Sequence, residues 1–200
     1  MARAPSKAAL RRQLRARRAA LSDSEQALAA QRIAAHVGAT RWFMAARRIA
    51  CYLPNDGEID PSLILERIWR TRKHAFLPVL PRPARDRLWF APAVPGMELA
   101  RNRYGIPEPR VRARELLSAD ALDLVLLPLV AFDIRGNRLG RGAGFYDRSL
   151  AFLRLREHLR KPRLLGLAHD FQRVDALTAD SWDVRLDGIV TDQAVYYADS

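Results

Sequence analysis

The feature that most limits the possible folds of this chain is one apolar stretch, residues 122–132 (LDLVLLPLVAF). A strand with one face in water alternates apolar and polar residues, whereas a strand buried on both faces is apolar almost throughout. Proline cannot donate to a sheet ladder, so the strand should run into a loop at Pro128. The stretch therefore predicts a central strand that other elements cover on both faces.

The segments around this strand alternate between helical and extended patterns. Helices are predicted over residues 7–21, 23–37, 60–69 and 147–156, and strands over residues 48–53, 74–80, 87–93, 163–168 and 187–196. Ser22 and Glu25 have capping-box spacing, and Asp60 with Pro61 predicts an N-cap followed by the first helical residue. This alternation is typical of an α/β sandwich with a largely parallel sheet. We expect residues 1–200 to form a single domain.

The chain is strongly basic, with 34 basic and 22 acidic side chains and a net charge of +12. Much of the excess lies in residues 1–50, where Asp23 and Glu25 are the acidic residues. A basic balance favours anionic partners, such as nucleic acid, a membrane surface or small polyanions. In the helix predicted over residues 7–21, arginines surround leucines at core spacing. This pattern fits a nucleic-acid arm, an organelle transit peptide or the solvated face of a domain helix.

Other classes of protein are excluded by composition. Cys51 is the single cysteine, which excludes a disulfide framework and a cysteine-based metal site. No apolar run approaches the roughly 18 residues that a membrane span requires. No apolar segment with a small-residue cleavage site follows Met1, as a secretory signal would require. We therefore expect a cytoplasmic protein.

A glycine-rich segment, residues 133–147 (DIRGNRLGRGAGFYD), follows the apolar strand and precedes a predicted helix. Its glycines are Gly136, Gly140, Gly142 and Gly144. Glycine lets backbone N–H groups approach an anion closely, and Arg138 and Arg141 offer forked donors suited to phosphate. The spacing matches neither a Walker A loop nor a dinucleotide fingerprint. From the residues alone, the segment is either an unfamiliar phosphate or nucleotide loop or a flexible turn.

Acidic residues near this loop suggest a metal ion. Asp147 begins the predicted helix, and a carboxylate beside a phosphate loop often holds Mg²⁺. The alternative is that Asp147 stabilises the helix dipole. Asp183 and Asp187 form a second acidic pair before the last strand, which alone is a weak metal signal.

At the glycine-rich segment the sequence resembles a known family. Residues 127–150 (LPLVAFDIRGNRLGRGAGFYDRSL) are similar to the signature of 5-formyltetrahydrofolate cyclo-ligase, also called 5,10-methenyltetrahydrofolate synthetase. Further segments resemble this family in order, at residues 7–11, 52–60, 104–109 and 166–192. The resemblance thus extends over residues 7–192 and is far more specific than a single loop.

The resemblance implies a three-layer α/β/α sandwich with a mostly parallel central sheet. It also implies an enzyme that uses ATP and Mg²⁺ to cyclise 5-formyltetrahydrofolate to 5,10-methenyltetrahydrofolate, releasing ADP and phosphate. In the implied mechanism the formyl oxygen attacks the γ-phosphate, N10 attacks the activated carbon, and phosphate leaves. The expected partners are these small molecules, with no specific nucleic acid, no membrane and a monomeric state.

The resemblance also implies roles for individual residues. ATP binding is assigned to Lys7, Ala8, Ala9, Leu10, Arg11, Arg138, Leu139, Gly140, Arg141, Gly142, Ala143, Gly144, Phe145 and Tyr146. Substrate binding is assigned to Leu53, Glu58, Arg141, Gly142, Ala143, Gly144 and Phe145, catalysis to Lys7, Arg138, Arg141 and Asp147, and Mg²⁺ to Asp147 and Asp183. Tyr104 is expected to form an aromatic wall or to pack in the core.

The sequence departs from the family pattern at four positions. Ala143 stands where glycine or lysine is usual, and Phe145 replaces a common tyrosine. Trp182 replaces a frequent histidine, and Asp192 replaces a usual glutamate. None of these changes removes a group expected to bind phosphate or metal.

Two other functions remain open on the sequence alone. Sugar-phosphate isomerases and coenzyme A transferases share this general architecture, so the fold by itself does not settle the chemistry. A requirement for ATP would separate the cyclo-ligase from the isomerases. A nucleic-acid-binding protein would bind DNA or RNA with steep salt dependence, but no known nucleic-acid module is visible in the sequence.

Overall fold

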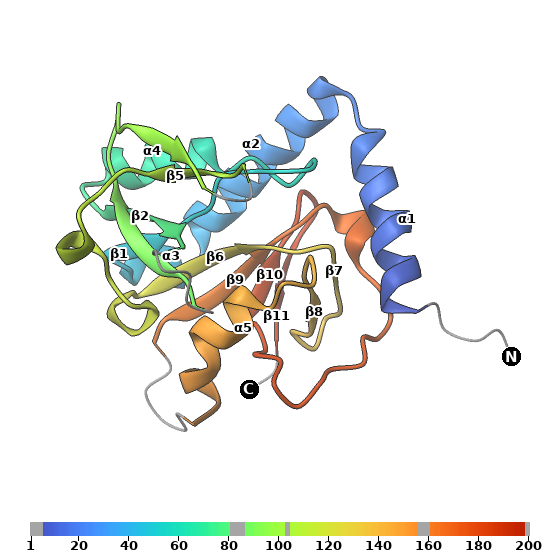
Figure 1. The fold of residues 1–200 in the computed structure, drawn as a ribbon. Helices are drawn as coiled ribbons and strands as arrows, with labels where there is room; N and C mark the ends of the chain where they lie inside the picture. Colours follow the sequence, from blue (N-terminus) through green and yellow to red (C-terminus); the bar gives the residue numbers. More distant parts are fainter. Residues whose placement is uncertain (1–5, 81–86, 103–104, 156–160, 199–200) are drawn as a thin grey trace, which may run out of the picture.

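The computed structural model describes residues 6–80, 87–102, 105–155 and 161–198. Its centre is a seven-stranded sheet with the strand order β11-β10-β9-β6-β1-β2-β3 (Figure 1). These strands are β1 (Arg48–Ala50), β2 (His74–Val79), β3 (Trp89–Ala93), β6 (Leu124–Pro128), β9 (Arg163–Leu167), β10 (Gly188–Val190) and β11 (Val195–Tyr197). The inner strands from β10 to β2 are parallel, while β3 and β11 pair antiparallel at the two edges. The prediction of a mostly parallel sheet is confirmed.

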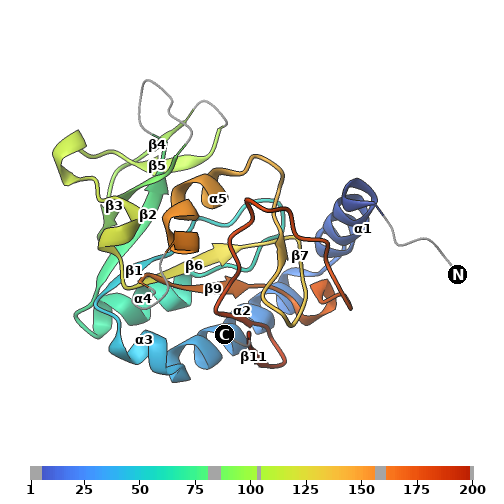
Figure 2. The same ribbon diagram turned by 90° about the horizontal axis from the view of Figure 1, so that it is seen from below.

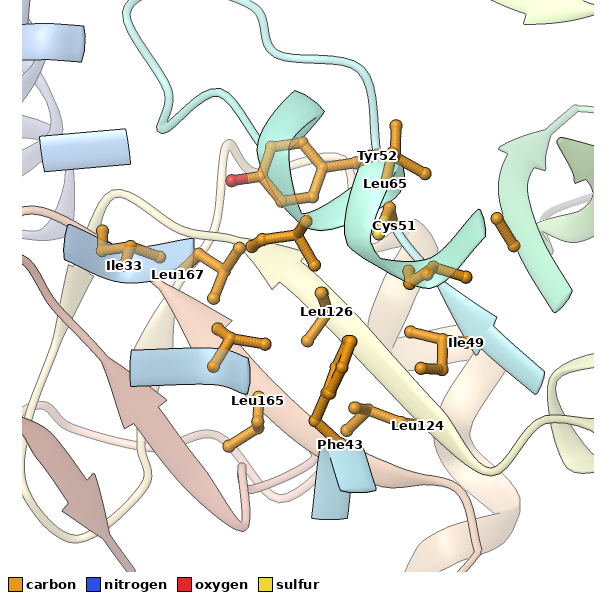
Figure 3. Close-up of a cluster of buried hydrophobic side chains, with 14 of the residues drawn as sticks. Ile33, Phe43, Ile49, Cys51, Tyr52, Leu65, Leu124, Leu126, Leu165 and Leu167 are labelled. Atoms are coloured by element: carbon orange, nitrogen blue, oxygen red, sulfur yellow. The ribbon is translucent and has the colours of Figure 1, made fainter. Parts of the chain in front are cut away.

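Strand β6 is buried on both faces, as its apolar sequence predicts. Leu124 and Leu126 face one hydrophobic cluster, and Val125 and Leu127 face another. All four side chains are fully buried. Figure 3 shows the first cluster, with Leu126 lying among residues of the sheet and of the helices that cover it. Successive residues of a strand point to opposite faces, so β6 supplies the centre of two cores at once.

Helices cover both faces of the sheet. One face carries α2 (Asp23–Ala39), α3 (Arg41–Ala45) and α4 (Ser62–Arg70), and the other carries α5 (Phe145–Leu150) (Figures 1 and 2). Short 3-10 helices lie at Ala113–Glu115, Ala119–Ala121, Ala151–Leu155 and Asp170–Gln172. The predicted capping box of α2 is present, since Ser22 and Glu25 each accept a backbone N–H of the other. The α/β/α layering is therefore confirmed.

Helix α1 (Lys7–Ala19) lies beside the layers, next to strand β7 (Ala131–Phe132) (Figure 1). Leu10 and Leu14 are buried and form a small cluster with Val130, Ala131 and Leu139. The leucine face predicted for this helix thus packs against the segment that follows β6. Arginines cover much of the exposed face of the same helix.

Two hairpins were not anticipated. Strand β7 pairs with β8 (Arg138–Leu139) inside the glycine-rich segment. Strand β4 (Leu99–Arg101) pairs with β5 (Pro107–Pro109) in the proline-rich region after β3. Both hairpins consist of strands of two or three residues, too short to leave a periodic pattern in the sequence.

Several predicted boundaries were wrong. The strand predicted over 187–196 is instead the antiparallel pair β10 and β11, because the hydroxyl of Thr191 accepts the N–H groups of Gln193 and Ala194 and forms a turn. The strand predicted over 48–53 ends at Ala50. Pro61, not Asp60, takes the N-cap position of α4, while the Asp60 carboxylate accepts the N–H of Ser62 at 2.9 Å.

One further boundary differs near the glycine-rich segment. The helix predicted over 147–156 begins earlier, at Phe145, and changes to a 3-10 helix after Leu150. Strand β6 ends at Pro128, where the loop was predicted, and β7 then leaves the main sheet to pair with β8. Among the described helices, none has the length and apolar character that crossing a bilayer requires.

The position of β6 gives a test of this core. We expect Leu126→Ala to lower the free energy of unfolding by about 2–5 kcal/mol, because it leaves a cavity in the centre of the sheet. Leu155, which is 86% exposed, provides a matched control, and Leu155→Ala should change the same quantity by at most about 0.5 kcal/mol. Urea denaturation of both variants measures the difference. Equal losses in the two variants would contradict the central burial of β6.

Candidate active site

A cavity of about 850 Å³ opens at the carboxyl ends of the parallel strands. Tyr52 and Leu53 line it just beyond β1, and Pro128 lines it at the end of β6. From β1 the chain continues to β2 on one side, whereas from β6 it continues to β9 on the other. The boundary between β1 and β6 is thus the point where the strand order reverses, and ligands of open α/β sheets bind at such points.

The glycine-rich segment reaches the cavity through the β7–β8 hairpin. The buried carboxylate of Asp133 shapes this hairpin by accepting the N–H groups of Arg135, Asn137 and Leu177. Gly136 turns the hairpin with φ at +85°, and a Cβ there would lie 2.5 Å from the carbonyl oxygen of Leu186. Glycine at this position therefore lets the turn pack against the backbone of a distant segment.

Beyond the hairpin, the segment becomes the wall of the cavity and then helix α5. Gly142 and Gly144 adopt φ values of +107° and +66°, which favour glycine. Within the described ranges, the non-glycine residues with positive φ are Asp56 and Arg72, so Ala143 carries its Cβ without that strain. The departure from the family pattern at Ala143 is compatible with this backbone.

Arg138 connects the hairpin to two other parts of the wall. Its side chain is only 5% exposed, and it donates to Asp147 Oδ1 at 2.5 Å. It also donates to the carbonyl oxygen of Val184, whose own N–H donates to Asp147 Oδ1 at 3.3 Å. The guanidinium group, the start of α5 and residues 180–184 are thereby held together at one side of the cavity.

Helix α1 brings two more cations to the same side. Lys7 forms an ion pair with Asp180 at 2.6 Å, and both side chains remain more than one-third exposed. Arg11 donates from Nε to the carbonyl oxygen of Gly140 at 2.9 Å. Ion pairs as exposed as that of Lys7 contribute little to stability, so its lysine is available to an anionic ligand at small cost.

Glu58 also lines the cavity and is 8% exposed. Its Oε2 accepts the N–H of Asn55 at 3.1 Å. Burial raises the pKa of this carboxyl, while the positive charges of Arg141 and Arg18 oppose the rise. Burial also raises the pKa of the phenols of Tyr52 and Tyr146, with the nearby charge of Glu58 as the next contribution. The lining therefore has a cationic side around Lys7, Arg11 and Arg138 and an acidic, aromatic side around Glu58, and the charge of Arg141 acts on Glu58.

The described residues contain no group of three or more histidine, cysteine, aspartate or glutamate side chains placed to hold a metal. Asp147 and Asp183 nevertheless line the same cavity. Mg²⁺ commonly takes one or two carboxylates and completes its shell with water and phosphate oxygens. The pair fits a Mg²⁺ ion that arrives with a nucleotide and does not fit a metal centre built from protein alone.

Most site residues predicted from the sequence are brought together in this cavity. Those that line it are Lys7, Arg11, Leu53, Glu58, Arg138, Leu139, Gly140, Arg141, Gly142, Ala143, Gly144, Phe145, Tyr146, Asp147 and Asp183. Ala8, Ala9 and Leu10 are not in the lining, and Leu10 instead packs beneath α1. The helix turns these three side chains away from the face that carries Lys7 and Arg11. Tyr104 lies outside the described residues.

Sequence reasoning missed an apolar wall and several polar groups. The wall includes Leu77, Pro78, Leu80, Leu88, Ile106 and Pro107, from β2 and the β4–β5 hairpin with its neighbours. Glu108 joins them and accepts the N–H of Leu80 at 2.9 Å. The resemblance over 104–109 was the only signal for this hairpin. Asp180 and Trp182 also line the cavity, and no local motif marks Asp180 as the partner of Lys7.

The chain matches the model of the 5-formyltetrahydrofolate cyclo-ligase family over residues 3–192. It is 38% identical over 183 residues to 5-formyltetrahydrofolate cyclo-ligase of Escherichia coli strain K12, covering 92% of this chain and 98% of that protein. The enzyme of the same name from Haemophilus influenzae is 35% identical over 177 residues, covering 88% of this chain and 92% of that protein.

Solved structures are similar over almost the whole fold. The NMR structure of 5,10-methenyltetrahydrofolate synthetase from Aquifex aeolicus aligns with a TM-score of 0.80 and 28% identity, covering 97% of this chain and 93% of that chain. The structure of the Mycoplasma pneumoniae synthetase aligns with a TM-score of 0.72 and 28% identity, covering 94% and 99% of the two chains. Matches of this extent show that the protein belongs to the 5-formyltetrahydrofolate cyclo-ligase family and is a ligase.

Proposed function

We propose that this protein uses ATP and Mg²⁺ to cyclise 5-formyltetrahydrofolate to 5,10-methenyltetrahydrofolate, with release of ADP and phosphate. The observation that carries the proposal is a single cavity with a cationic glycine-rich side and an acidic, apolar side, in a chain of this family. The reaction joins an anionic nucleotide and a largely aromatic substrate, and both must reach the same reacting atoms. A cavity with these two sides is suited to that task.

The cationic side is proposed to bind the triphosphate. Lys7 and Arg11 come from α1, and Arg138 and Arg141 come from the glycine-rich segment. Forked guanidinium donors and backbone N–H groups of glycine-rich turns both bind phosphate oxygens. Lys7 pairs with Asp180, and Arg138 pairs with Asp147. These carboxylates balance part of the positive charge on this side of the cavity.

Asp147 and Asp183 are the residues proposed to hold Mg²⁺. Bound there, the ion would neutralise charge on the phosphate groups during transfer. Arg138 and the N–H of Val184 both contact Asp147 Oδ1 and hold this carboxylate in place, so that it would position the ion next to the loop. Asp183 Oδ2 accepts the N–H of Asp180, the partner of Lys7, at 2.9 Å, which supports a shared site for the metal and the phosphates.

The acidic and apolar side is proposed to bind the folate. The carboxylate of Glu58 can accept hydrogen bonds from the amino and ring N–H groups of a pterin. Leu53 lies beside it, and the apolar wall from β2 and the β4–β5 hairpin can cover the rest of the aromatic substrate. Residues Arg141, Gly142, Ala143, Gly144 and Phe145 line the same cavity, and both ligands are proposed to touch them.

The proposed chemistry makes a poor leaving group into a good one. The formyl oxygen attacks the γ-phosphorus of ATP, and ADP leaves. N10 then attacks the formyl carbon, and the oxygen departs as part of inorganic phosphate while N10 loses its proton. The contribution of the protein is mainly to orient the two ligands and to balance charge, as in other phosphoryl transfers.

The direct test is an absorbance assay. Purified protein mixed with 5-formyltetrahydrofolate, ATP and Mg²⁺ should develop the near-ultraviolet absorbance of the methenyl product. Omission of ATP, or removal of Mg²⁺ with a chelator, should abolish the signal. Product formed at full rate without ATP would contradict the proposed reaction.

Lys7 gives a test of the phosphate side. We expect Lys7→Met to raise the KM for ATP by about tenfold or more, because a charge-assisted contact to phosphate is lost. Lys161 is a matched control, since its side chain is 65% exposed and pairs with Asp123 on another part of the surface. Lys161→Met should leave both kinetic constants nearly unchanged. An unaltered KM for ATP in Lys7→Met would remove this lysine from the site.

Glu58 gives a test that combines stability with binding. Its raised pKa means that the folded state holds the proton more tightly than the unfolded state, so stability falls as pH rises from the unfolded value toward the folded one. Glu58→Gln removes this penalty. The variant should therefore resist thermal unfolding at pH 7 at least as well as the native protein, with the advantage shrinking as the pH falls toward about 4.

The same variant should bind substrate less well. The amide of glutamine offers one acceptor where the carboxylate offers two, so the KM for 5-formyltetrahydrofolate should rise by about tenfold. Thermal unfolding and steady-state kinetics on one preparation measure both effects. A lower melting temperature at pH 7 with an unchanged KM would contradict the role of Glu58.

A further inference from the structure

The orientation of Glu58 depends on the tight turn that precedes it. Asp56 and Gly57 both adopt left-handed conformations, with φ at +60° and +69°. The turn closes on itself, because Glu58 donates its N–H to the carbonyl oxygen of Asn55 and accepts the N–H of Asn55 on Oε2. A shift of this turn would therefore move the carboxylate that faces the cavity.

The carboxylate of Asp56 connects the turn to helix α1. Asp56 Oδ2 accepts Arg15 Nε at 2.6 Å and a terminal nitrogen of Arg18 at 3.2 Å. Gly57 packs against Arg18, since a Cβ at residue 57 would lie 3.3 Å from the Arg18 Cβ and 3.4 Å from its carbonyl oxygen. The last turn of α1 and the Asp56 turn thus form one packed unit.

Arg18 is the more unusual member of this unit. Its side chain is 1% exposed, and its Nε is buried without a hydrogen-bond partner among the described residues. Its other terminal nitrogen donates to the carbonyl oxygen of Leu129, just beyond the end of β6, at 3.3 Å. Burial lowers the pKa of this arginine, while the charges of Glu58 and Asp56 oppose the change.

A role in stability alone does not account for this arrangement. Replacing a buried ion pair by apolar side chains often leaves the free energy of unfolding unchanged or raises it. A buried donor without a hydrogen-bond partner lowers that free energy. Arg18 instead connects three elements that form the acidic side of the cavity: α1, the turn at Asp56 and the carboxyl end of β6. Neither Arg18 nor Asp56 is part of the cavity lining.

Helix α1 also serves the other side of the cavity. Lys7 and Arg11 reach the loops at Asp180 and Gly140, while Arg15 and Arg18 reach Asp56. These residues follow one another at intervals of three and four, which places them along one face of a helix. One short helix therefore spans from the proposed phosphate side to the turn that carries Glu58.

We propose that Arg18 and Asp56 are positioning residues that hold the Glu58 carboxylate in place for the folate substrate. The proposal rests on the proposed function of Glu58 as a substrate ligand. The pair itself does not touch the substrate; it fixes the turn from which Glu58 projects. Loss of the pair should weaken binding of the folate while leaving the nucleotide side intact.

The primary experiment uses Asp56→Asn. Asparagine tolerates the left-handed conformation of residue 56 and nearly keeps its shape, so the turn can form without its charge. We expect the KM for 5-formyltetrahydrofolate to rise by about tenfold, with kcat and the KM for ATP changing by less than about twofold. Arg15→Met, at the more exposed pair, should produce a smaller change in the same direction.

Arg18→Met and a control on the same helix complete the set. Arg18→Met should reproduce the effect of Asp56→Asn, and the double variant should add little to either one, because both changes break the same contact. Arg12 is exposed on α1, so Arg12→Met should leave all three kinetic constants unchanged. If Arg18→Met does not fold, Arg18→Lys replaces it in the comparison of single and double variants. Lysine keeps the charge but not the forked contact.

A second readout does not depend on turnover. In Asp56→Asn without any ligand, hydrogen exchange at the amides of Asn55 and Glu58 should become faster than in the native protein, by more than the loss of global stability accounts for. Unaltered exchange and an unaltered KM for the folate would overturn the proposal, as would equal losses in kcat and both KM values. If the native protein forms no methenyl product, the proposed function fails. The hydrogen-exchange result still tests whether Arg18 and Asp56 hold the turn that carries Glu58.

Discussion

The burial of β6 on both faces is the constraint from which the rest of the molecule follows. Leu124 and Leu126 need a layer of helices on one face, and Val125 and Leu127 need a layer on the other. Its parallel neighbours β1 and β9 lead the chain away in opposite directions along the sheet. The connections that follow β1 and β6 therefore separate at the carboxyl ends of these two strands, and the cavity lies between them.

Part of the positive charge of the chain lies at the cavity. Lys7, Arg11, Arg138 and Arg141 line the cavity, and α1 carries further arginines on its exposed face. Leu10 and Leu14 of α1 are buried, so this helix is packed into the fold. That packing favours its interpretation as a domain helix whose polar face meets both the cavity and solvent.

The exclusion of nucleic-acid partners, the monomeric state and the single domain stay predictions.

Much of the architecture was predictable because it rests on local patterns. The continuous apolar stretch predicted β6, the leucine spacing predicted α1, and the Ser22–Glu25 box predicted the start of α2. The hairpins were not predictable, since β4, β5, β7 and β8 are too short to show a period. The turn after β10 depends on the Thr191 hydroxyl, whose role an apolar run conceals.

The candidate site divides in the same way. The glycine-rich segment and its arginines could be predicted because the phosphate-binding residues are close together in the sequence. The apolar wall from β2 and the β4–β5 hairpin was missed, because its members meet only through sheet pairing and packing. The partnership of Lys7 with Asp180 joins residues 173 positions apart, and the role of Arg18 depends on its burial against a turn. Such relations follow from tertiary structure and leave no local signal.

The proposed reaction requires one cavity to bring the formyl oxygen of the folate to the γ-phosphate of ATP. The most direct measurement follows that oxygen atom, using substrate labelled with ¹⁸O in the formyl group and mass analysis of the products after ATP-driven turnover. If the formyl oxygen attacks the γ-phosphorus, the label is recovered in inorganic phosphate. Recovery of the label in water, with unlabelled phosphate, would contradict it.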